Sequence, residues 1–295
     1  MKKHIISVRD LDRETVNRLW SLFIEFRNGR RESLDGDVAL LFLESSTRTR
    51  FSFERACRLL GLRTYYAGRG ETSIEKGESF YDTIRTLRAI GFEAVIFRVP
   101  FVLFPYEAYK SLDISLINAG DGTHQHPTQG LTDLFTAIDT FRSLEGLRVL
   151  YVGDILHSRV FRSGAYLFRL FGARLGVCGP KPLIPSDLSP FEVEQVFDRM
   201  EDALEWADLC IWLRLQEERF RENYVVSKES YFSLFGLTRD KHKKLKGYFM
   251  HPGPVNSYVD LDGEVIYSEK SLVLKQVENG LYTRMAVLYW ALGYG

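Results

Sequence analysis

The first residues that could do chemistry form a short run of hydroxyl-bearing and cationic side chains, Ser46-Thr47-Arg48-Thr49-Arg50. The run follows an apolar stretch and leads into a helix-like segment. Hydroxyl groups, guanidinium groups and the unpaired N–H groups of a helix start suit a phosphate, which offers several acceptor oxygens and up to two negative charges. Serine and threonine are also common helix N-caps, so capping alone is the alternative interpretation.

A second polar run contains glycines and two histidines, Gly120-Asp121-Gly122-Thr123-His124-Gln125-His126-Pro127-Thr128-Gln129. Glycine lets a backbone approach a ligand closely, while His126 and Gln129 can donate hydrogen bonds to a carbonyl or phosphoryl oxygen. Because His124 and His126 would share one face of a strand, a metal site is the alternative. No HExxH or similar spacing accompanies them, so we predict that no metal is bound.

Three polar runs in the second half of the sequence also follow apolar stretches. They are Gly153-Asp154-Ile155-Leu156-His157-Ser158-Arg159, Arg214-Leu215-Gln216 and His251-Pro252-Gly253-Pro254. Arg159 and Arg214 suit an anion with two carboxylates, because each guanidinium can form a bidentate pair with one carboxylate. Either arginine alone could instead form a structural ion pair.

Two further places carry isolated cations. Arg98 comes at the end of an apolar stretch, where a lone arginine is usually an ion-pair partner. The segment 71–78 contains Lys76 and has only Ile74 as an apolar anchor, so by itself it is typical of a surface loop.

Nucleotide-binding glycine motifs are absent from the sequence. Gly68-Arg69-Gly70 is followed by Ser73 where a dinucleotide fingerprint requires its last glycine, and Gly153-Asp154 lacks the spacing altogether. No GxxxxGK[ST] phosphate loop occurs. These absences argue against nicotinamide and ATP-loop chemistry.

The elements that must position the polar runs are short apolar segments. Seven continuous apolar runs occur, at 38–43, 94–97, 115–117, 149–152, 175–177, 209–213 and 248–250. Continuous rather than alternating hydrophobicity predicts strands covered on both faces. Amphipathic, helix-length segments lie between most of them, including 51–60, 131–141 and 160–171. The alternation predicts an α/β protein with parallel sheets, whose ligands bind beyond the carboxyl ends of the strands.

Two other segments mark the organisation of the chain. The stripe Val16, Leu19, Trp20 and Phe23 follows a candidate N-cap at Asp12 and predicts an amphipathic helix before Gly29. The segment 219–246 is rich in Lys, Arg, Ser and Tyr with weak periodicity, which fits a surface insertion or a lid. The stretch 142–146 is the best domain boundary and divides the 295 residues almost in half.

Composition restricts the class of protein. Lys+Arg 39 against Asp+Glu 39 gives a formal net charge of zero, so no basic excess favours nucleic-acid binding. The hydrophobic share of 45% and the charged share of 26% are those of a packed globular protein, with an enzyme or a binding protein as the default.

Cysteine usage and hydropathy bear on location. Cys57, Cys178 and Cys210 form no CxxC, which predicts free core thiols in a reducing compartment. The apolar run near the N-terminus is too short for a signal peptide, and no window approaches the roughly 20 apolar residues of a membrane span. We therefore expect a soluble cytoplasmic protein with no membrane partner.

Taken together, the polar runs resemble those of aspartate carbamoyltransferase catalytic chains. The matching blocks occur in the family's order and spacing across 38–260: Ser46 to Arg50, Lys76-Gly77-Glu78, Gly120-Asp121-Gly122 with His126-Pro127-Thr128-Gln129, His157-Ser158-Arg159, Arg214-Leu215-Gln216 with Glu218-Arg219, and His251-Pro252-Gly253-Pro254. The resemblance implies two doubly wound domains, each with a central parallel sheet. A carbamoyl-phosphate-binding domain would cover 1–142, completed by a C-terminal helix at about 272–295, and an aspartate-binding domain would cover 143–271.

The resemblance also implies roles for individual residues. The carbamoyl-phosphate site would comprise Ser46, Thr47, Arg48, Thr49, Arg98, His126, Gln129, Gly253 and Pro254. The aspartate site would comprise Ser73, Lys76, Arg159, Arg214 and Gln216, with Ser73 and Lys76 arriving from the neighbouring subunit of a homotrimer. The catalytic set would be Arg48, Thr49, Lys76, Arg98, His126 and Gln129. The α-amine of L-aspartate would attack the carbamoyl carbon and expel phosphate, with no metal or cofactor.

Two alternatives remain open beside this interpretation. One is ornithine carbamoyltransferase, although that family typically has a His-Cys-Leu-Pro block where Pro252-Gly253-Pro254 follows His251 here. The other is a non-catalytic protein that binds carbamoyl phosphate and scaffolds a complex. Regulatory chains or a dihydroorotase are possible partners of the trimer.

Three positions depart from the family pattern. Val99 stands where many relatives have histidine, and Thr132 replaces a common leucine. Asn256-Ser257-Tyr258 lacks the arginine that often follows the proline loop, which puts the anchoring of that loop in question.

Overall fold

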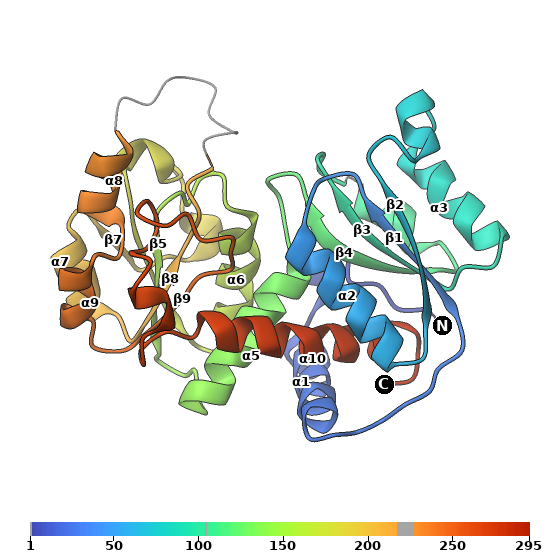
Figure 1. Ribbon diagram of the computed structural model, residues 1–295, viewed down its shortest axis with the longest axis horizontal. Coiled ribbons are helices and arrows are strands. Elements are labelled where there is room, and N and C mark those ends of the chain that lie inside the picture. Colours follow the sequence, from blue (N-terminus) through green and yellow to red (C-terminus); the bar gives the residue numbers. More distant parts are fainter. Residues whose placement is uncertain (1, 104, 217–226) are drawn as a thin grey trace. The chain divides into compact units, whose positions relative to one another are not determined.

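The computed structural model describes residues 2–103, 105–216 and 227–295. By its internal contacts the chain forms two compact units: unit 1, Met1–Thr132 with Glu278–Gly295, and unit 2, Asp133–Val277. Each unit contains one fully parallel sheet flanked by helices, which confirms the predicted α/β class (Figure 1). The chain passes from one unit to the other within α5 (Pro127–Phe141) and again within α10 (Val273–Ala291).

Unit 1 is built on a four-stranded sheet with the order β2-β1-β3-β4. Its strands are β1 (Asp37–Phe42), β2 (Arg63–Gly68), β3 (Ala94–Val99) and β4 (Ser115–Asp121). Its helices, besides parts of α5 and α10, are α1 (Arg13–Arg27), α2 (Thr47–Leu59), α3 (Phe80–Ala89) and α4 (Tyr106–Lys110), with single 3-10 turns at Val8–Asp10 and Ser73–Lys76. The Asp12 side chain caps α1 by accepting from the backbone N–H of Thr15, as predicted.

Helices cover both faces of the unit 1 sheet, with α3 on one side and α1 and α2 on the other (Figure 1). On the α3 side, the rings of Phe80 and Phe97 lie 5.3 Å apart and belong to one buried cluster with Leu41. On α2, Phe53 is fully buried, and the guanidinium of Arg284 from α10 lies 5.2 Å from its ring. Burial on both sides explains why β1 and β3 are continuously apolar.

Unit 2 is built on a five-stranded sheet with the order β7-β6-β5-β8-β9. Its strands are β5 (Arg148–Val152), β6 (Arg174–Cys178), β7 (Gln195–Phe197), β8 (Leu209–Trp212) and β9 (Tyr248–Met250). Its described helices, besides parts of α5 and α10, are α6 (Arg159–Leu170), α7 (Met200–Trp206), α8 (Lys228–Phe235) and α9 (Arg239–Lys244), with 3-10 turns at Lys181–Leu183, Ser189–Phe191 and Val265–Tyr267.

Alternate residues of the central strands pack on opposite faces of this second sheet. The ring of Tyr151 lies 5.1 Å from that of Phe161 in α6. Its neighbour Leu150 instead joins a cluster with Leu204 of α7 and Trp212. The sheet therefore separates α6 from α7, and the predicted double covering is confirmed in this unit as well (Figure 1).

Two strands, β2 and β7, were not expected from the sequence. Both lie at sheet edges, and most of their residues are exposed or half-buried. Tyr65 of β2 and Val196 of β7 are 51% and 52% exposed, respectively. An edge strand pairs on one side only and can be exposed to solvent; β2 and β7 are exposed, so neither carries a continuous apolar run.

The predicted excursion at 219–246 is only partly described, and its described portion is helical. Residues 227–246 contain α8 and α9, and Tyr231, Leu237 and Leu245 from this segment are buried. These contacts make the described portion part of unit 2 rather than a loose insertion. Glu218 and Arg219 lie outside the described residues.

The three cysteines are free and buried, and burial raises the pKa of Cys57 and of Cys178 to about 12. Such thiols stay protonated at neutral pH and are poor nucleophiles. No described helix is long and apolar enough to cross a membrane.

One ion pair, at the amino-terminal ends of β5 and β8, makes the stability of the fold depend on pH. Nε and Nη2 of Arg148 donate to Asp208 at 2.9 and 2.6 Å, and these bonds lower the pKa of the Asp208 carboxyl. A carboxyl with a lowered pKa stabilises the fold above its unfolded-state pKa, and this stabilisation is lost as pH falls through the folded-state value. We expect Asp208→Asn to remove less than about 1 kcal/mol at neutral pH, because the side chains are 36% and 34% exposed.

Thermal unfolding of wild type and Asp208→Asn at about pH 7 and about pH 3 measures this effect. The difference in Tm should shrink at the lower pH. An equal difference at both pH values would contradict the assignment.

Candidate active site

The Ser46–Thr49 run forms the start of α2 in unit 1. The helix begins at Thr47, and the Ser46 side chain, at the N-cap position, makes no capping hydrogen bond. Thr47 and Arg48 are exposed, whereas Thr49 is buried. Because N–H groups in the first turn of a helix have no partner within the helix, this end combines hydroxyls, amide donors and positive charge. The Ser46 hydroxyl therefore does not cap α2. The start of this helix suits the binding of an anion.

The second arginine of the run is held differently from the first. Nε of Arg50 donates to Glu54 at 2.7 Å, and its guanidinium lies 3.5 Å from the centre of the Tyr66 ring. Arg50 is therefore engaged on the side of α2, while Arg48 remains exposed at the helix start.

Arg98 lies at the carboxyl end of β3, between the ends of two neighbouring strands. Its Nε is 3.3 Å from a carboxylate oxygen of Glu44, which follows β1, and Nη1 donates to the carbonyl of Ala119 in β4 at 3.3 Å. The backbone N–H of Leu43 donates to the Arg98 carbonyl at 2.8 Å. Because β1, β3 and β4 are parallel neighbours, Arg98 lies at the same sheet edge as Ser46–Thr49 and the His126 run.

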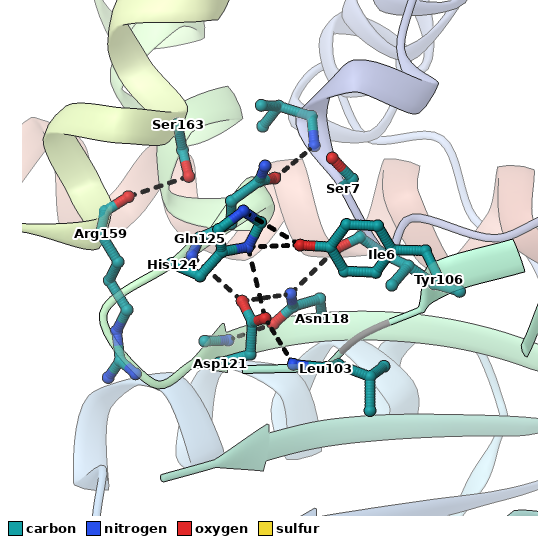
Figure 2. A network of polar contacts seen from close by, with 12 residues as sticks. Ile6, Ser7, Leu103, Tyr106, Asn118, Asp121, His124, Gln125, Arg159 and Ser163 are labelled. Carbon is teal, nitrogen blue, oxygen red and sulfur yellow. Dashed lines mark hydrogen bonds and ion pairs between the residues drawn. The ribbon is translucent and has the colours of Figure 1, made fainter. Parts of the chain in front are cut away.

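A buried network around Asp121 supports the turn before His126 (Figure 2). Asp121 is fully buried; Oδ1 accepts from the Asn118 side chain at 2.9 Å and from the Gln125 N–H at 3.0 Å, and Oδ2 accepts from the Leu103 N–H at 3.1 Å. Two further bonds reach the N-terminal segment: Gln125 Oε1 accepts from the Val8 N–H at 2.7 Å, and the Asn118 amide donates to the Ile6 carbonyl at 2.9 Å. One carboxylate thus fixes the turn that carries His126.

His126 and Gln129 lie at the start of α5 and are buried, with 5% and 9% exposure. The N–H of Gln129 donates to the His126 carbonyl at 3.0 Å, so the two residues share one helical turn. The ring of His124 instead contacts the Tyr106 hydroxyl and lies 3.5 Å from Asp121 (Figure 2). Within 2–103, 105–216 and 227–295, no three potential metal ligands come together.

Ser73 and Lys76 belong to a single 3-10 turn and are exposed. Gly77 ends the turn with a φ of 98°, a conformation that favours glycine. Among the described residues, no hydrogen bond or ion pair joins either side chain to another predicted site residue. The chain itself therefore leaves these two side chains open to solvent.

In unit 2, the polar runs after β5 and β8 are joined directly. Arg159 is the first residue of α6 and is 7% exposed, and the Ser158 hydroxyl caps this helix by accepting from the Phe161 N–H at 3.1 Å. Gln216 Nε2 donates to the carbonyl of His157 at 3.0 Å. The structure thus brings Gln216 next to the segment that carries Arg159.

Asp154, directly after β5, is the acid that ties these two runs together. It is fully buried, and it accepts from the Nδ1 of His157 at 2.9 Å and from the N–H of Gln216 at 3.3 Å. Burial raises the pKa of Asp154, and the bonds from His157 and Gln216 oppose that rise. Asp154 was not singled out in the sequence, because its position directly after a strand does not by itself show that the carboxylate is buried.

A cavity of about 440 Å³ opens beside the run after β8. Its lining residues are Arg214, Leu215, Lys228, Val255, Asn256, Ser257 and Val259. Pro254 immediately precedes this lining, and Gly253 has a φ of 74°. Lys228 was not singled out in the sequence, because a lysine in the 219–246 segment resembles any surface lysine.

Two family profiles together cover nearly all of the chain. The profile described as aspartate/ornithine carbamoyltransferase, carbamoyl-P binding domain, matches residues 3–139. The profile described as aspartate/ornithine carbamoyltransferase, Asp/Orn binding domain, matches residues 145–291. The resemblance drawn from the polar runs is confirmed.

Similar proteins agree with these profiles. The chain is 54% identical over 286 residues to the aspartate carbamoyltransferase catalytic subunit of Aquifex aeolicus, covering 97% of this chain and 98% of the relative. The protein of the same name from Prosthecochloris aestuarii is 42% identical over 302 residues, covering 97% and 96%. The structure of aspartate transcarbamoylase from Trypanosoma cruzi in complex with carbamoyl phosphate has a TM-score of 0.86 at 26% identity, covering 98% and 95%.

Proposed function

This chain belongs to the aspartate/ornithine carbamoyltransferase family, and we propose that it catalyses transfer of the carbamoyl group of carbamoyl phosphate to the α-amine of L-aspartate. The products are N-carbamoyl-L-aspartate and phosphate, as in pyrimidine biosynthesis. The enzyme acts without a metal or cofactor in this proposal.

Unit 1 supplies the carbamoyl-phosphate half of the site in this proposal. The phosphate is held by the start of α2 and by Arg98, through Ser46, Thr47, Arg48 and Thr49. His126 and Gln129, with Thr49 and Arg98, donate toward the carbamoyl oxygen. Their common sheet edge supports this grouping.

The reaction is a direct displacement at the carbamoyl carbon. The α-amine nitrogen forms a bond to that carbon, and a tetrahedral oxyanion develops, stabilised by the cationic and N–H donors around it. The bond to the phosphate oxygen then breaks, and the departing phosphate accepts the amine proton. Phosphate is a sufficient base for this step, so the mechanism needs no dedicated carboxylate.

Unit 2 supplies the aspartate-binding half of the site, and two arginines determine the substrate specificity. Arg159 and Arg214 follow neighbouring strands, and Gln216 is hydrogen-bonded beside the segment that carries Arg159. Two guanidiniums match the two carboxylates of aspartate, whereas ornithine would present a second cation. The backbone at Gly253 and Pro254, which belongs to the carbamoyl-phosphate site in this proposal, also receives the amine of aspartate.

A homotrimer with shared sites completes the proposal. Ser73 and Lys76 are exposed and serve the site of the neighbouring subunit. Exposed aromatic side chains on α2 and β2 support burial of this region by another chain; Phe51, Tyr65 and Tyr66 are 58%, 51% and 39% exposed. Regulatory chains and a dihydroorotase remain predicted partners, and free buried thiols support a cytoplasmic location.

The proposed function is tested with purified protein, carbamoyl phosphate and either L-aspartate or L-ornithine. We expect carbamoyl aspartate and equimolar phosphate with the first acceptor, and no citrulline with the second. Citrulline as the main product would identify an ornithine carbamoyltransferase. Binding of carbamoyl phosphate without turnover would instead identify a scaffold.

A further inference from the structure

We propose that Asp260 and His251 form a positioning pair that holds the 214–216 segment and the 253–256 loop at a set distance from each other. The inference rests on the proposed function, because these are the two segments of unit 2 that meet aspartate. Neither residue touches substrate in this proposal; each acts through the backbone it holds.

Asp260 bonds to both segments with one carboxylate. Asp260 as a whole residue is only 1% exposed. Oδ1 accepts from the N–H of Leu215 at 3.2 Å, and Oδ2 accepts from the N–H of Asn256 at 2.9 Å. The Asp260 N–H also donates to the Asn256 carbonyl at 2.9 Å. Leu215 and Asn256 line the same cavity, so Asp260 sets the separation of two parts of its wall.

His251 extends the same connection to the glycine before Pro254. Its Nδ1 accepts from the N–H of Gly253 at 2.9 Å, so the ring proton lies on Nε2, which donates to Asp260 Oδ2 at 3.2 Å. The neutral ring thereby links the loop to the carboxylate. Both side chains have 0% exposure, which keeps water from replacing these bonds.

A second support holds His251 from the side of the helices. Its backbone N–H donates to Gln276 Oε1 at 2.9 Å, and Gln276 Nε2 donates to Asp133 Oδ1 at 2.7 Å. Gln276 lies on α10 and Asp133 on α5, and both are buried. The positioning pair is therefore fastened to regular elements of unit 2 rather than to loops alone.

These contacts also explain how the loop is anchored without the family's usual arginine. Asn256-Ser257-Tyr258 departs from the family pattern, but the loop is held by the Asp260 carboxylate and by a bond from the Tyr258 N–H to the Leu261 carbonyl at 2.8 Å. The anchor comes from a buried acid within the same loop.

The informative variant is Asp260→Asn, which keeps the shape of the side chain. Three N–H donors converge on two carboxylate oxygens, and an amide has only one acceptor oxygen. At least one donor would then face an NH₂ group. Because an unpaired buried donor is costly, we expect the KM for aspartate to rise at least about tenfold. The KM for carbamoyl phosphate should rise by a smaller factor, because only Gly253 and Pro254 of its proposed site lie in unit 2.

The matched control is Asp262→Asn, two residues along the same loop. Asp262 is also buried, and it accepts from the N–H of Glu264 at 3.0 Å and from Nε of Arg239 at 3.3 Å. Among the residues that the structure describes, its carboxylate makes no hydrogen bond to either segment that meets aspartate. We expect this variant to keep both KM values near those of the wild type.

Hydrogen exchange of the substrate-free protein tests the pair independently of activity. In Asp260→Asn, the amides of Leu215 and Asn256 should both exchange faster than in wild type and in Asp262→Asn. His251→Gln keeps a donor toward Asp260 but loses the acceptor for Gly253, so it should loosen the 253–256 loop and leave Leu215 protected. It also serves as the test if Asp260→Asn does not fold.

The outcomes separate the proposal from the proposed function. Unchanged exchange in both variants, or faster exchange with an unchanged KM for aspartate, would overturn the positioning role. A wild-type protein that forms no carbamoyl aspartate would overturn the proposed function, while the exchange result would still decide whether the pair holds the two segments.

Discussion

Replacing Arg48 with alanine is expected to lower kcat/KM about 10²- to 10³-fold, which is the usual cost of losing one donor to a developing charge. Arg48 is exposed at the first turn of α2, beside a serine that makes no capping bond. In the proposed reaction its guanidinium binds the phosphate and stabilises the charge that grows on it as the carbamoyl bond breaks. Steady-state kinetics and calorimetric titration with carbamoyl phosphate measure the loss.

Arg50→Ala is the matched control for this variant. Arg50 lies two residues along the same helix, but its guanidinium is engaged by Glu54 and by the Tyr66 ring. We expect Arg50→Ala to retain most of the activity. Equal losses in the two variants, or an Arg48→Ala enzyme within about fivefold of wild type, would contradict the assignment of Arg48.

Lys76→Ala is expected to abolish most turnover while largely preserving carbamoyl-phosphate binding. Lys76 is exposed on a 3-10 turn and has no partner among the described residues, so its removal should leave the fold intact. In the proposed trimer its ammonium enters the neighbouring site and meets the substrates there. The measurement is kcat beside a binding titration, with Lys110→Ala as control because Lys110 instead pairs with Asp10 at 2.5 Å.

Mixing the two inactive variants tests whether Lys76 acts across subunits. A trimer that contains both Arg48→Ala and Lys76→Ala chains has one site with Arg48 from one chain and Lys76 from its neighbour. Random reassembly of equal amounts should therefore recover about a quarter of the wild-type activity. If each site were complete within one chain, no mixture would recover activity.

The strands of the fold were predictable wherever burial covered both faces. Each of the seven apolar runs is a strand, because a strand that is covered on both faces has no solvent-facing side to accommodate polar residues. This holds for β4 and β9 too, which lie at sheet edges but are mostly buried. The edge strands β2 and β7 escaped prediction for the converse reason. Tyr65 and its neighbours face solvent, so their pattern resembles that of a loop.

The proposed site was predictable where the side chains that would meet substrate stand directly after strands. Arg48, His126 and Arg214 all follow apolar runs, and chemistry that needs cations at such places limits the choice of residue. The acids that hold these segments in place were not predictable. Asp154 and Asp260 look like ordinary surface acids in the sequence, and only burial against converging N–H donors reveals their role.

The amino-acid sequence by itself determined the α/β class and the family, because continuous apolar runs and the spacing of motifs can be read directly along the chain. Folding decided which runs become neighbours. In the sheet order β7-β6-β5-β8-β9, the ends of β5 and β8 lie side by side. In the sequence, 56 residues lie between Val152, the last residue of β5, and Leu209, the first residue of β8. Hydrogen bonds then join those ends through buried carboxylates, and such pairings depend on long-range contacts that no short stretch of sequence encodes.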